Sequence, residues 1–383
     1  MRWMYPELMG AAATGIWLYL LLGRGQFWRM REAPPPGPLP GGAPSVVAVV
    51  PARNEAPVVG RAVASLAQQT YPGEFHIVLS DDASDDGTGR AASEAGHEAG
   101  RAGRLTVIRA GRLPDGWTGK MWAVAAGVQA ADHLHPEYLL LTDADIVHAP
   151  DNLAGLVARA QSGGYDLVSY MVKLECRTPA EQALIPAFVF FFFMLYPPSH
   201  GTGAAGGCIL IRWDALERVG GIARIRGELI DDCALARVVR QNGGRVWMGL
   251  SAATCGIRGY GAGYAGFGQI GRMIARTAFT QLRHSALLLL GTVLGLAVTY
   301  LAPPLLTLLG PRGAASGMGA VAWLLMSVAY YPALRFYHRP WFWAPLLPAI
   351  ALFYLGATIY SAVAYWRGAG GLWKGRVQDS AGR

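Results

Sequence analysis

Apolar and mixed stretches alternate through the first part of the chain. Four mostly apolar runs predict strands, at 45–51, 75–79, 105–109 and 138–142. The uninterrupted run 45–51 is typical of a strand buried on both faces. Three intervening stretches predict helices, at 57–69, 88–99 and 120–131. Alternating strands and helices favour a parallel sheet covered by helices on both faces. Ligands bind such sheets beside the carboxyl ends of the strands, so the residues that follow each strand are the first candidates for chemistry.

Longer uncharged stretches lie toward both ends of the chain. Leu8–Gly23 is followed by several arginines, which predicts a membrane anchor whose C-terminal side faces the cytoplasm. A cleaved signal peptide is the alternative, but Glu7 precedes the apolar run and the positive charge follows it. Three further stretches are each long enough to span a membrane: Ser285–Pro311, Gly313–Leu334 and Pro340–Trp366.

These patterns predict an N-terminal anchor, a linker, a large α/β domain, a helical membrane region and a tail. The expected boundaries are 1–31, 32–44, 45–284, 285–367 and 368–383, and the linker is rich in Pro and Gly. Within the α/β domain, the aromatic segment 183–198 is too short to span and is predicted to lie at the membrane interface. A buried core helix is the alternative for this segment. The Gly-rich aromatic stretch with Tyr260, Tyr264 and Phe267, which precedes Gln269, is expected to be a mobile loop that closes over the donor-binding site.

Composition supports a membrane protein. Hydrophobic residues make up 52% of the chain and charged residues only 15%, with a net charge of +8. Because no nucleic-acid-binding module is visible, we attribute the positive charge to an anionic membrane surface or a phosphate-bearing substrate. The four cysteines have no metal-ligand spacing and are expected to be free thiols. Four spans would place 24–284 in the cytoplasm but the basic tail outside, so the C-terminal topology stays open.

Carboxylates follow two of the predicted strands. The cluster Asp81–Thr88 holds four of them, and a polar turn with a helix cap is the simple alternative. Asp143-Ala144-Asp145 follows the strand at 138–142. Alternate residues of an extended segment point to the same side, so these two carboxylates can share one hard cation. Mg²⁺ or Mn²⁺ fits such oxygen ligands, with substrate phosphate oxygens completing the shell.

Three other sites carry candidate chemistry. Lys120 lies at a predicted helix start, where backbone amides and one ammonium group can bind phosphate. Asp231-Asp232 precedes the helical run Cys233–Gln241, and a carboxylate there is either a cap or a general base. The segment from Gln269 to Arg276 leads into the first C-terminal span, where charge needs no special role.

Six motifs, in this order within residues 45–280, resemble the family 2 glycosyltransferases, which have the GT-A fold. They are Pro51-Ala-Arg53-Asn-Glu55, Asp81–Thr88, Asp143-Ala-Asp145, Gly206–Gly221, Asp231-Asp232 and Gln269-x-x-Arg272-Met273. Asp231 stands where the family has Glu, and Met273 where it has Trp. The resemblance implies an α/β protein, with a GT-A type nucleotide-sugar-binding domain on a mixed, mainly parallel sheet, plus transmembrane α-helices.

The resemblance also implies roles for single residues. Asp82, with Asp81 nearby, would contact the base and ribose, Asp143 and Asp145 would hold Mg²⁺ or Mn²⁺, and Asp232 would be the catalytic base. The nucleotide-sugar-binding set implied in this way is Pro51, Arg53, Glu55, Asp81, Asp82, Lys120, Asp143, Gln269, Arg272 and Arg276.

A closer resemblance is to the hopene-associated glycosyltransferase group, related in layout to ceramide glucosyltransferases. It extends to Leu113–Lys120, Phe188–Pro198 and the arrangement of one N-terminal and three C-terminal spans. It implies an inverting, metal-dependent transfer from a nucleotide sugar, UDP-linked by this resemblance, to a membrane lipid such as a hopanoid. The expected place is the bacterial inner membrane, with the catalytic domain in the cytoplasm. The expected partners are the donor, the lipid acceptor and the membrane, with no nucleic acid.

Three alternatives stay open at this point. A polyprenyl-phosphate sugar transferase has a similar domain, but its phosphate acceptor needs no strong base. A processive polysaccharide synthase needs a channel, for which four spans are few. A non-catalytic membrane scaffold would have no reason to keep Asp143, Asp145, Asp232 and Arg272 together. The sugar, the acceptor, the metal and the oligomeric state are not specified by the sequence.

Overall fold

The computed structural model of the protein describes residues 4–33, 37–261, 263–310, 312–371 and 374. The chain divides into two compact units. The sheet unit consists of Glu32–Glu175 and Gly201–Arg258, and the helical unit of Met1–Arg31, Cys176–His200 and Gly259–Arg383. Residues 176–200 and 259–284, which the predicted domain 45–284 includes, therefore group with the helices.

The sheet unit is built on one mixed sheet in the order β3-β2-β1-β4-β7-β6-β8-β5. Strands β1 to β4 pair in parallel, β6 is parallel to β8, and the pairs β4/β7, β6/β7 and β5/β8 are antiparallel. The strands are β1 Val46–Ala52, β2 Phe75–Asp81, β3 Leu105–Arg109, β4 Tyr138–Thr142, β5 Ile146–His148, β6 Leu167–Lys173, β7 Cys208–Arg212 and β8 Val246–Gly256. The mixed sheet and the four strands predicted from the apolar runs are confirmed.

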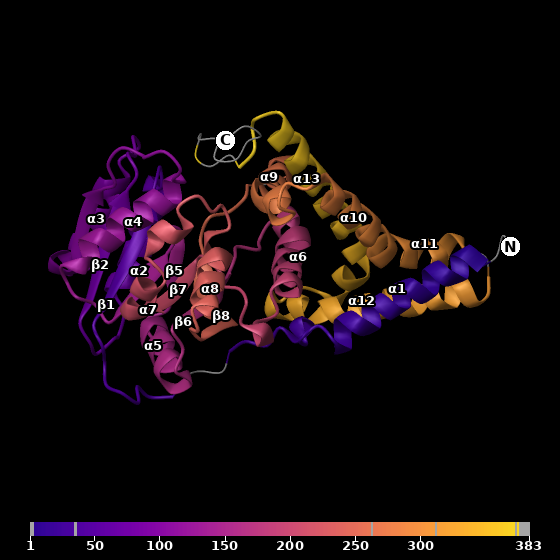
Figure 1. Ribbon diagram of the computed structural model, residues 1–383, viewed down its shortest axis with the longest axis horizontal. Helices are drawn as coiled ribbons and strands as arrows, with labels where there is room; N and C mark the ends of the chain where they lie inside the picture. Colours follow the sequence, from indigo (N-terminus) through magenta and orange to yellow (C-terminus); the bar gives the residue numbers. More distant parts are fainter. Residues whose placement is uncertain (1–3, 34–36, 262, 311, 372–373, 375–383) are drawn as a thin grey trace. The chain divides into compact units, whose positions relative to one another are not determined.

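Helices cover both faces of this sheet (Figure 1). Their bounds are α2 Ala56–Ala67, α3 Thr88–Glu98, α4 Gly119–Asp132, α5 Asn152–Gly163, α7 Trp213–Arg218 and α8 Asp231–Gln241. Alternate residues of β1 enter different cores: Val46, Ala48 and Val50 pack with α2, α3 and α5, whereas Val47 and Val49 pack with α4, α7 and α8. A strand buried on both faces must be apolar at every position, which explains the uninterrupted run in the sequence.

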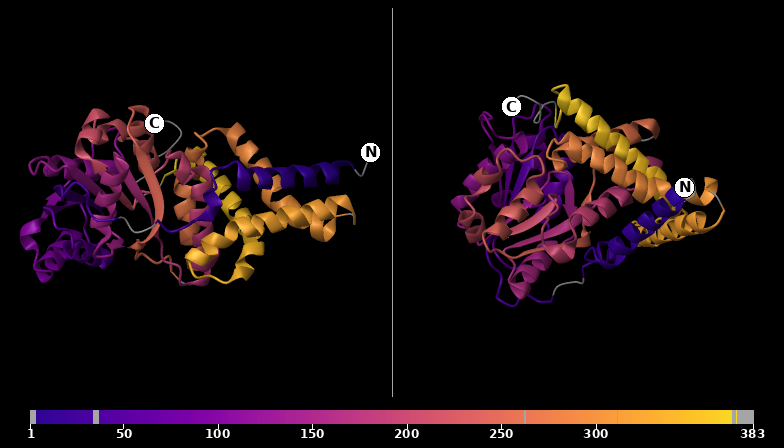
Figure 2. Two further views of the ribbon diagram at one scale, coloured as in Figure 1. Left: turned by 90° about the horizontal axis from the view of Figure 1, so that it is seen from below. Right: turned by 45° about the vertical axis from the view of Figure 1, so that its right-hand side comes forward.

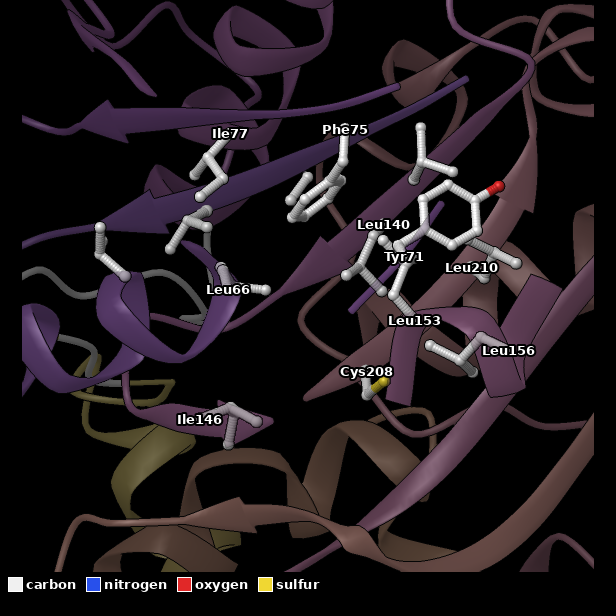
Figure 3. Packing of buried hydrophobic residues seen from close by; sticks show 14 of the residues in the cluster. Leu66, Tyr71, Phe75, Ile77, Leu140, Ile146, Leu153, Leu156, Cys208 and Leu210 are labelled. Carbon is white, nitrogen blue, oxygen red and sulfur yellow. The ribbon is translucent and has the colours of Figure 1, made fainter. Parts of the chain in front are cut away.

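The core between the sheet and helices α2 and α5 is shown in Figure 3. Leu66 of α2 and Leu153 and Leu156 of α5 reach the sheet side chains Ile77 and Leu140, and all five are at most 2% exposed. This packing fixes the carboxyl ends of β1, β2 and β4 against one another, and the acidic motifs follow those ends.

Within the described ranges, seven α-helices belong to the helical unit. They are α1 Met4–Leu22, α6 Pro179–Leu195, α9 Gly263–Gln281, α10 Ala286–Leu296, α11 Ala302–Leu309, α12 Ala314–Phe336 and α13 Leu347–Trp366. Figure 2 shows this unit from two further directions. Among the described residues, four helical segments are long and apolar enough to cross a membrane: Pro179–His200, Ala286–Leu309, Ala314–Phe336 and Trp341–Trp366. The last three are the C-terminal segments predicted to span.

The first of these four segments corrects the prediction for the aromatic region 183–198. The helix begins at Pro179, because Thr178 accepts a hydrogen bond from the amide of Glu181 while the Glu181 carboxylate accepts those of Arg177 and Thr178. This capping box begins the helix four residues before the predicted segment. The prediction that this segment is too short to cross a membrane was therefore wrong. Its interfacial position stays a prediction.

Helix α1 lies alongside α12 in every view (Figures 1 and 2). The Thr14 hydroxyl donates to the carbonyl of Met318 at 3.1 Å, and the Trp17 indole nitrogen donates to the carbonyl of Thr299 at 2.9 Å. A Cβ at Gly10 would lie 3.0 Å from that of Met318, so glycine permits this close approach. The predicted N-terminal anchor thus packs on the C-terminal helices.

Below the acidic motifs, a buried hydrogen-bonded chain joins β4, β5 and α5. The Thr142 hydroxyl donates to the carbonyl of Gly207 at 2.8 Å, so it accepts from Nε2 of His148 at 2.9 Å. His148 Nδ1 then accepts from the Asn152 amide, also at 2.9 Å. Burial lowers the pKa of His148 to about 4. A second ring proton would also face the Asn152 donor, so this histidine is neutral in the folded protein.

His148 is expected to make stability depend on pH. Between an unfolded pKa near 6.5 and a folded pKa of about 4, unfolding takes up a proton, so stability falls as the pH falls through this window. The loss between pH 7.5 and 5 is about 2 kcal/mol. Thermal unfolding of the full-length protein across this range is the measurement. His148→Gln should show a correspondingly weaker pH dependence, and an equal dependence in both proteins would contradict this assignment.

Candidate active site

Three loops follow the parallel strands β1, β2 and β4, and they meet at one edge of the sheet unit. The first carries Arg53 and Glu55, the second Asp81–Thr88, and the third Asp143 and Asp145. Pro51, the first member of the predicted set, pairs with Ser80 in the sheet. The prediction that these motifs gather at the carboxyl ends of the strands is met by the strand order.

The first two loops are tied together by hydrogen bonds. Arg53 donates to the carbonyl of Asp82, and its guanidinium lies 3.6 Å from the Asp82 carboxylate, which is 1% exposed. The Asp81 carboxylate accepts from the amide and hydroxyl of Ser84. The Asp86 carboxylate accepts from the amides of Ala56 and Thr88, at the starts of α2 and α3. The acidic cluster therefore does build a turn and two caps, while Asp81 and Asp82 also lie at the strand ends where ligands bind.

Lys120 is placed between two carboxylates. Thr118 caps α4 by accepting the amide of Met121 at 3.3 Å, which puts Lys120 in the first turn of that helix. Its ammonium group lies 3.0 Å from Asp143 and 3.2 Å from Asp231. Burial disfavours the charged ammonium, but these two carboxylates outweigh burial and raise the pKa of Lys120. Lys120 is therefore positively charged and links the loop after β4 to the start of α8.

Asp232 occupies the second position of α8. Its two carboxylate oxygens accept hydrogen bonds from the amides of Gly206, at 2.8 Å, and Cys233, at 2.7 Å. Burial raises its pKa, and so does neighbouring Asp231; Lys120 and the two amides lower it, and the outcome is a pKa of about 6. A carboxylate with such a pKa is ionised at neutral pH and more basic than an exposed one, as a general base requires.

A small pocket brings these groups together within the sheet unit. Its polar wall consists of Lys120, Asp143, Asp231 and Asp232, and its apolar wall includes Met121, Leu141, Ile209, Ile222 and Leu235. A Cβ added to Gly206 would lie 3.3 Å from the Asp232 carboxylate and 3.5 Å from the Lys120 ammonium. Glycine at this position therefore leaves room beside the carboxylate.

The second carboxylate of the Asp-x-Asp motif has a different partner. Nε of Arg258 lies 2.8 Å from the Asp145 carboxylate, and Nη2 of the same guanidinium pairs with Glu55. Arg258 follows the last residue of β8 by two positions, and the amide of Ile257 donates to the carbonyl of Asp145 at 3.0 Å. The strand pairing of β5 with β8 thus puts Arg258 beside Asp145.

Asp143 and Asp145 suit a hard cation by their chemistry. Both offer carboxylate oxygens, and their side chains are 35% and 25% exposed, so an ion can reach them. No group of three or more His, Cys, Asp and Glu side chains with metal-binding geometry occurs in the part of the chain that the structure describes. Any ion held there would need oxygens from its ligand, as the sequence prediction assumed.

Gln269, Arg272 and Arg276 belong to the helical unit. All three lie on α9, and Arg272 lines a pocket between α9 and α13 with Phe267, Phe353 and Tyr360. Helix α9 begins at Gly263, so Tyr264 and Phe267 lie on a helix and not in the predicted mobile loop. The donor-binding role of these three residues stays a prediction.

Sequence reasoning missed Arg258 and the contact of Gly206 with Asp232. Arg258 belongs to no motif, and only the pairing of β5 with β8 brings it to Asp145. Gly206 begins the motif Gly206–Gly221, but its hydrogen bond to Asp232 spans 26 residues of sequence, and no local pattern predicts it.

Part of the chain is similar to a known protein family. Residues 47–220 match the family model "Glycosyl transferase family 2". This range includes Lys120, Asp143 and Asp145 and ends before Asp232 and Arg258. No curated protein sequence matches the chain.

Solved structures are similar at low sequence identity. The mannosyltransferase PcManGT from Pyrobaculum calidifontis, in complex with GDP-Man and Mn²⁺, is 20% identical with a TM-score of 0.55, over 94% of this chain and 99% of that one. TarS of S. aureus is 14% identical over 85% and 56% of the two chains, with a TM-score of 0.40. Glucosyl-3-phosphoglycerate synthase of M. tuberculosis is 16% identical over 55% and 70%, with a TM-score of 0.36.

The likeness to the mannosyltransferase shows a shared fold along nearly the whole chain. The family match lies on the strands and loops that carry the first half of the site. Residues 47–220 are therefore a glycosyl transferase family 2 domain, and the protein is a glycosyltransferase.

Proposed function

We propose that the enzyme transfers a sugar from a nucleoside diphosphate sugar to the hydroxyl group of a membrane lipid, with inversion at the anomeric carbon. The observation that carries this proposal is the position of Asp232, a half-buried carboxylate that lies in one pocket with Lys120 and Asp143. Burial and neighbouring Asp231 raise the pKa of this carboxylate to about 6. A hydroxyl acceptor needs such a base, because its proton must leave as the new bond forms. A phosphate acceptor is already ionised, so the polyprenyl-phosphate alternative leaves Asp232 without a task.

The proposed reaction is a single displacement. The acceptor oxygen attacks the anomeric carbon while the Asp232 carboxylate takes the hydroxyl proton. The bond between that carbon and the diphosphate oxygen breaks, and the nucleoside diphosphate leaves with the electron pair. Lys120 pairs with both Asp143 and Asp231 in this pocket. It therefore keeps the proposed metal ligand Asp143 close to the start of α8, which carries the base Asp232.

A divalent cation is part of the proposal. Asp143 and Asp145 would hold it, and when bound it would supply positive charge for the leaving diphosphate. The similar mannosyltransferase was solved with GDP-Man and Mn²⁺, and a related synthase structure contains Mn²⁺ and UDP-glucose. Mn²⁺ or Mg²⁺ and either nucleotide are therefore the ligands to test first.

The lipid acceptor is supported by the apolar helices. Four segments are long and apolar enough to cross a membrane, and one of them, Pro179–His200, carries the aromatic run. An acceptor whose tail stays in the bilayer fits an enzyme held there. We place the enzyme in the bacterial inner membrane with its sheet unit in the cytoplasm, where nucleotide sugars are available, and we take a hopanoid as the first candidate acceptor from the resemblance to the hopene-associated group.

The direct test is a donor and acceptor panel. Purified full-length protein in detergent or lipid is incubated with UDP-sugars and GDP-mannose, Mg²⁺ or Mn²⁺, and hopanoid, ceramide or polyprenyl-phosphate acceptors. Mass spectrometry should find a metal-dependent glycolipid that is absent with Asp145→Ala. A product on polyprenyl phosphate alone would sink the hydroxyl-acceptor proposal, and no donor consumption under any condition would leave the lipid glycosylation proposal without support.

Asp232→Asn should reduce kcat by about 10²- to 10⁴-fold, the usual contribution of a general base. Binding of the nucleotide should change little, because the amide keeps the shape of the side chain. The wild-type rate should rise with pH through an apparent pKa of about 6, since only the ionised carboxylate accepts a proton. Asp214→Asn is the matched control, because Asp214 is an exposed carboxylate paired with Arg212 and Arg218. A kcat loss below threefold in Asp232→Asn would rule out the assigned role.

Lys120→Met should move the acidic limb of the pH–rate profile to higher pH. Lys120 lowers the pKa of Asp232, so removing its charge makes the base harder to ionise. Lys120→Arg keeps the charge and should leave the limb close to that of the wild type. If the limb stays in place in Lys120→Met while the rate falls, the two groups are not coupled as the geometry indicates.

A further inference from the structure

Arg258 holds two carboxylates that come from different strand ends. Its Nε lies 2.8 Å from the Asp145 carboxylate, and its Nη2 pairs with Glu55. Glu55 follows β1 and Asp145 follows β4, so one guanidinium bridges two of the three loops of the site. The Arg258 guanidinium thus pairs with Asp145 in the same way that the Lys120 ammonium group pairs with Asp143.

The position of Arg258 is fixed by the sheet. Ile146 pairs with Gly256 in the antiparallel ladder of β5 and β8, and the amide of Ile257 donates to the carbonyl of Asp145. The Cα atom of Arg258 is therefore held beside Asp145 by backbone bonds. Its side chain can move away from the carboxylate while its backbone stays at the edge of the site.

The guanidinium is the most accessible member of this contact. The Arg258 side chain is 39% exposed, against 11% for Glu55 and 25% for Asp145, so a ligand can reach it. A planar guanidinium with several N–H donors also matches phosphate oxygens, often through two hydrogen bonds at once. Arg258 is thus an accessible phosphate-binding group located next to a carboxylate of the Asp-x-Asp motif.

We propose that Arg258 binds the diphosphate of the sugar donor. Before the donor binds, its guanidinium pairs with Asp145 and Glu55 and takes the place of a divalent cation there. The inference rests on the proposed use of a metal-bound nucleoside diphosphate sugar. Arg258 would compete with a divalent cation for the Asp145 carboxylate. Away from this carboxylate, its guanidinium would pair with the diphosphate, where its charge would stabilise the leaving group.

Two binding measurements on the full-length protein in detergent test this inference. Electron paramagnetic resonance of free Mn²⁺ gives the affinity for the ion without nucleotide. Calorimetry with UDP, GDP and the corresponding monophosphates, at saturating Mn²⁺, gives the contribution of the second phosphate. Both are made on the wild type, Arg258→Gln, Arg258→Lys and Arg218→Gln.

Arg258→Gln should bind Mn²⁺ more tightly in the absence of nucleotide, by about three- to tenfold, because the competing charge is gone. It should bind the diphosphate about 10- to 100-fold more weakly, the value of a charge-assisted contact. The affinity of Arg258→Gln for the monophosphate should fall by no more than about threefold. Arg258→Lys keeps a charge without the planar fork and should lie between wild type and Arg258→Gln. Arg218→Gln is the matched control, since Arg218 is an exposed guanidinium that also pairs with two carboxylates, Asp166 and Asp214.

The outcomes separate the inference from the proposed function. If the wild type binds a diphosphate with Mn²⁺ and Arg258→Gln binds both ligands equally well, the inference is wrong and the proposed function stands. Equal losses for diphosphate and monophosphate together with a lower melting temperature would make Arg258 a structural ion pair only. A wild type that binds neither UDP nor GDP would count against the proposed function itself.

Discussion

Charge compensation at the carboxyl edge of the sheet is the constraint on which this site depends. The loops after β1 and β4 and the start of α8 bring Glu55, Asp143, Asp145 and Asp231 into a small space, and like charges so close would repel. Lys120 and Arg258 each hold two of these carboxylates. These two cations thereby connect three separate segments. Ion pairs and the pairing of the strands together fix the positions of the side chains in the site.

Asp232 shows how the same arrangement sets reactivity. Burial and Asp231 make its ionised form less favourable, and Lys120 and two backbone amides make it more favourable. Neither influence alone would give a useful base: burial alone would keep the carboxyl group neutral, and full compensation would leave a weakly basic carboxylate. Lys120 lowers the pKa of Asp232 while its ammonium group pairs with Asp143 and Asp231.

The sequence predicted the parts of this protein that depend on local pattern. The strands β1 to β4 were evident because each is a mostly apolar run, which is uninterrupted in β1 and β4 because these strands are buried on both faces. The acidic motifs were evident because they follow β2 and β4. Arg258 and the hydrogen bond of Gly206 were not predictable, because antiparallel pairing late in the chain creates these contacts. The length of α6 was misjudged since its capping box lies among charged residues, before the aromatic run.

Helix α1 has its hydrogen-bonding partners close to the other end of the chain. Thr14 and Trp17 bond to carbonyl groups of Met318 and Thr299, about 300 residues later. During synthesis the ribosome therefore completes the sheet unit, which ends at Arg258, before the helical unit can close. Until then the indole N–H of Trp17 in the first helix lacks its carbonyl acceptor on Thr299. A chain truncated before Thr299 would keep every strand, yet its first helix would lack both of these hydrogen-bond acceptors.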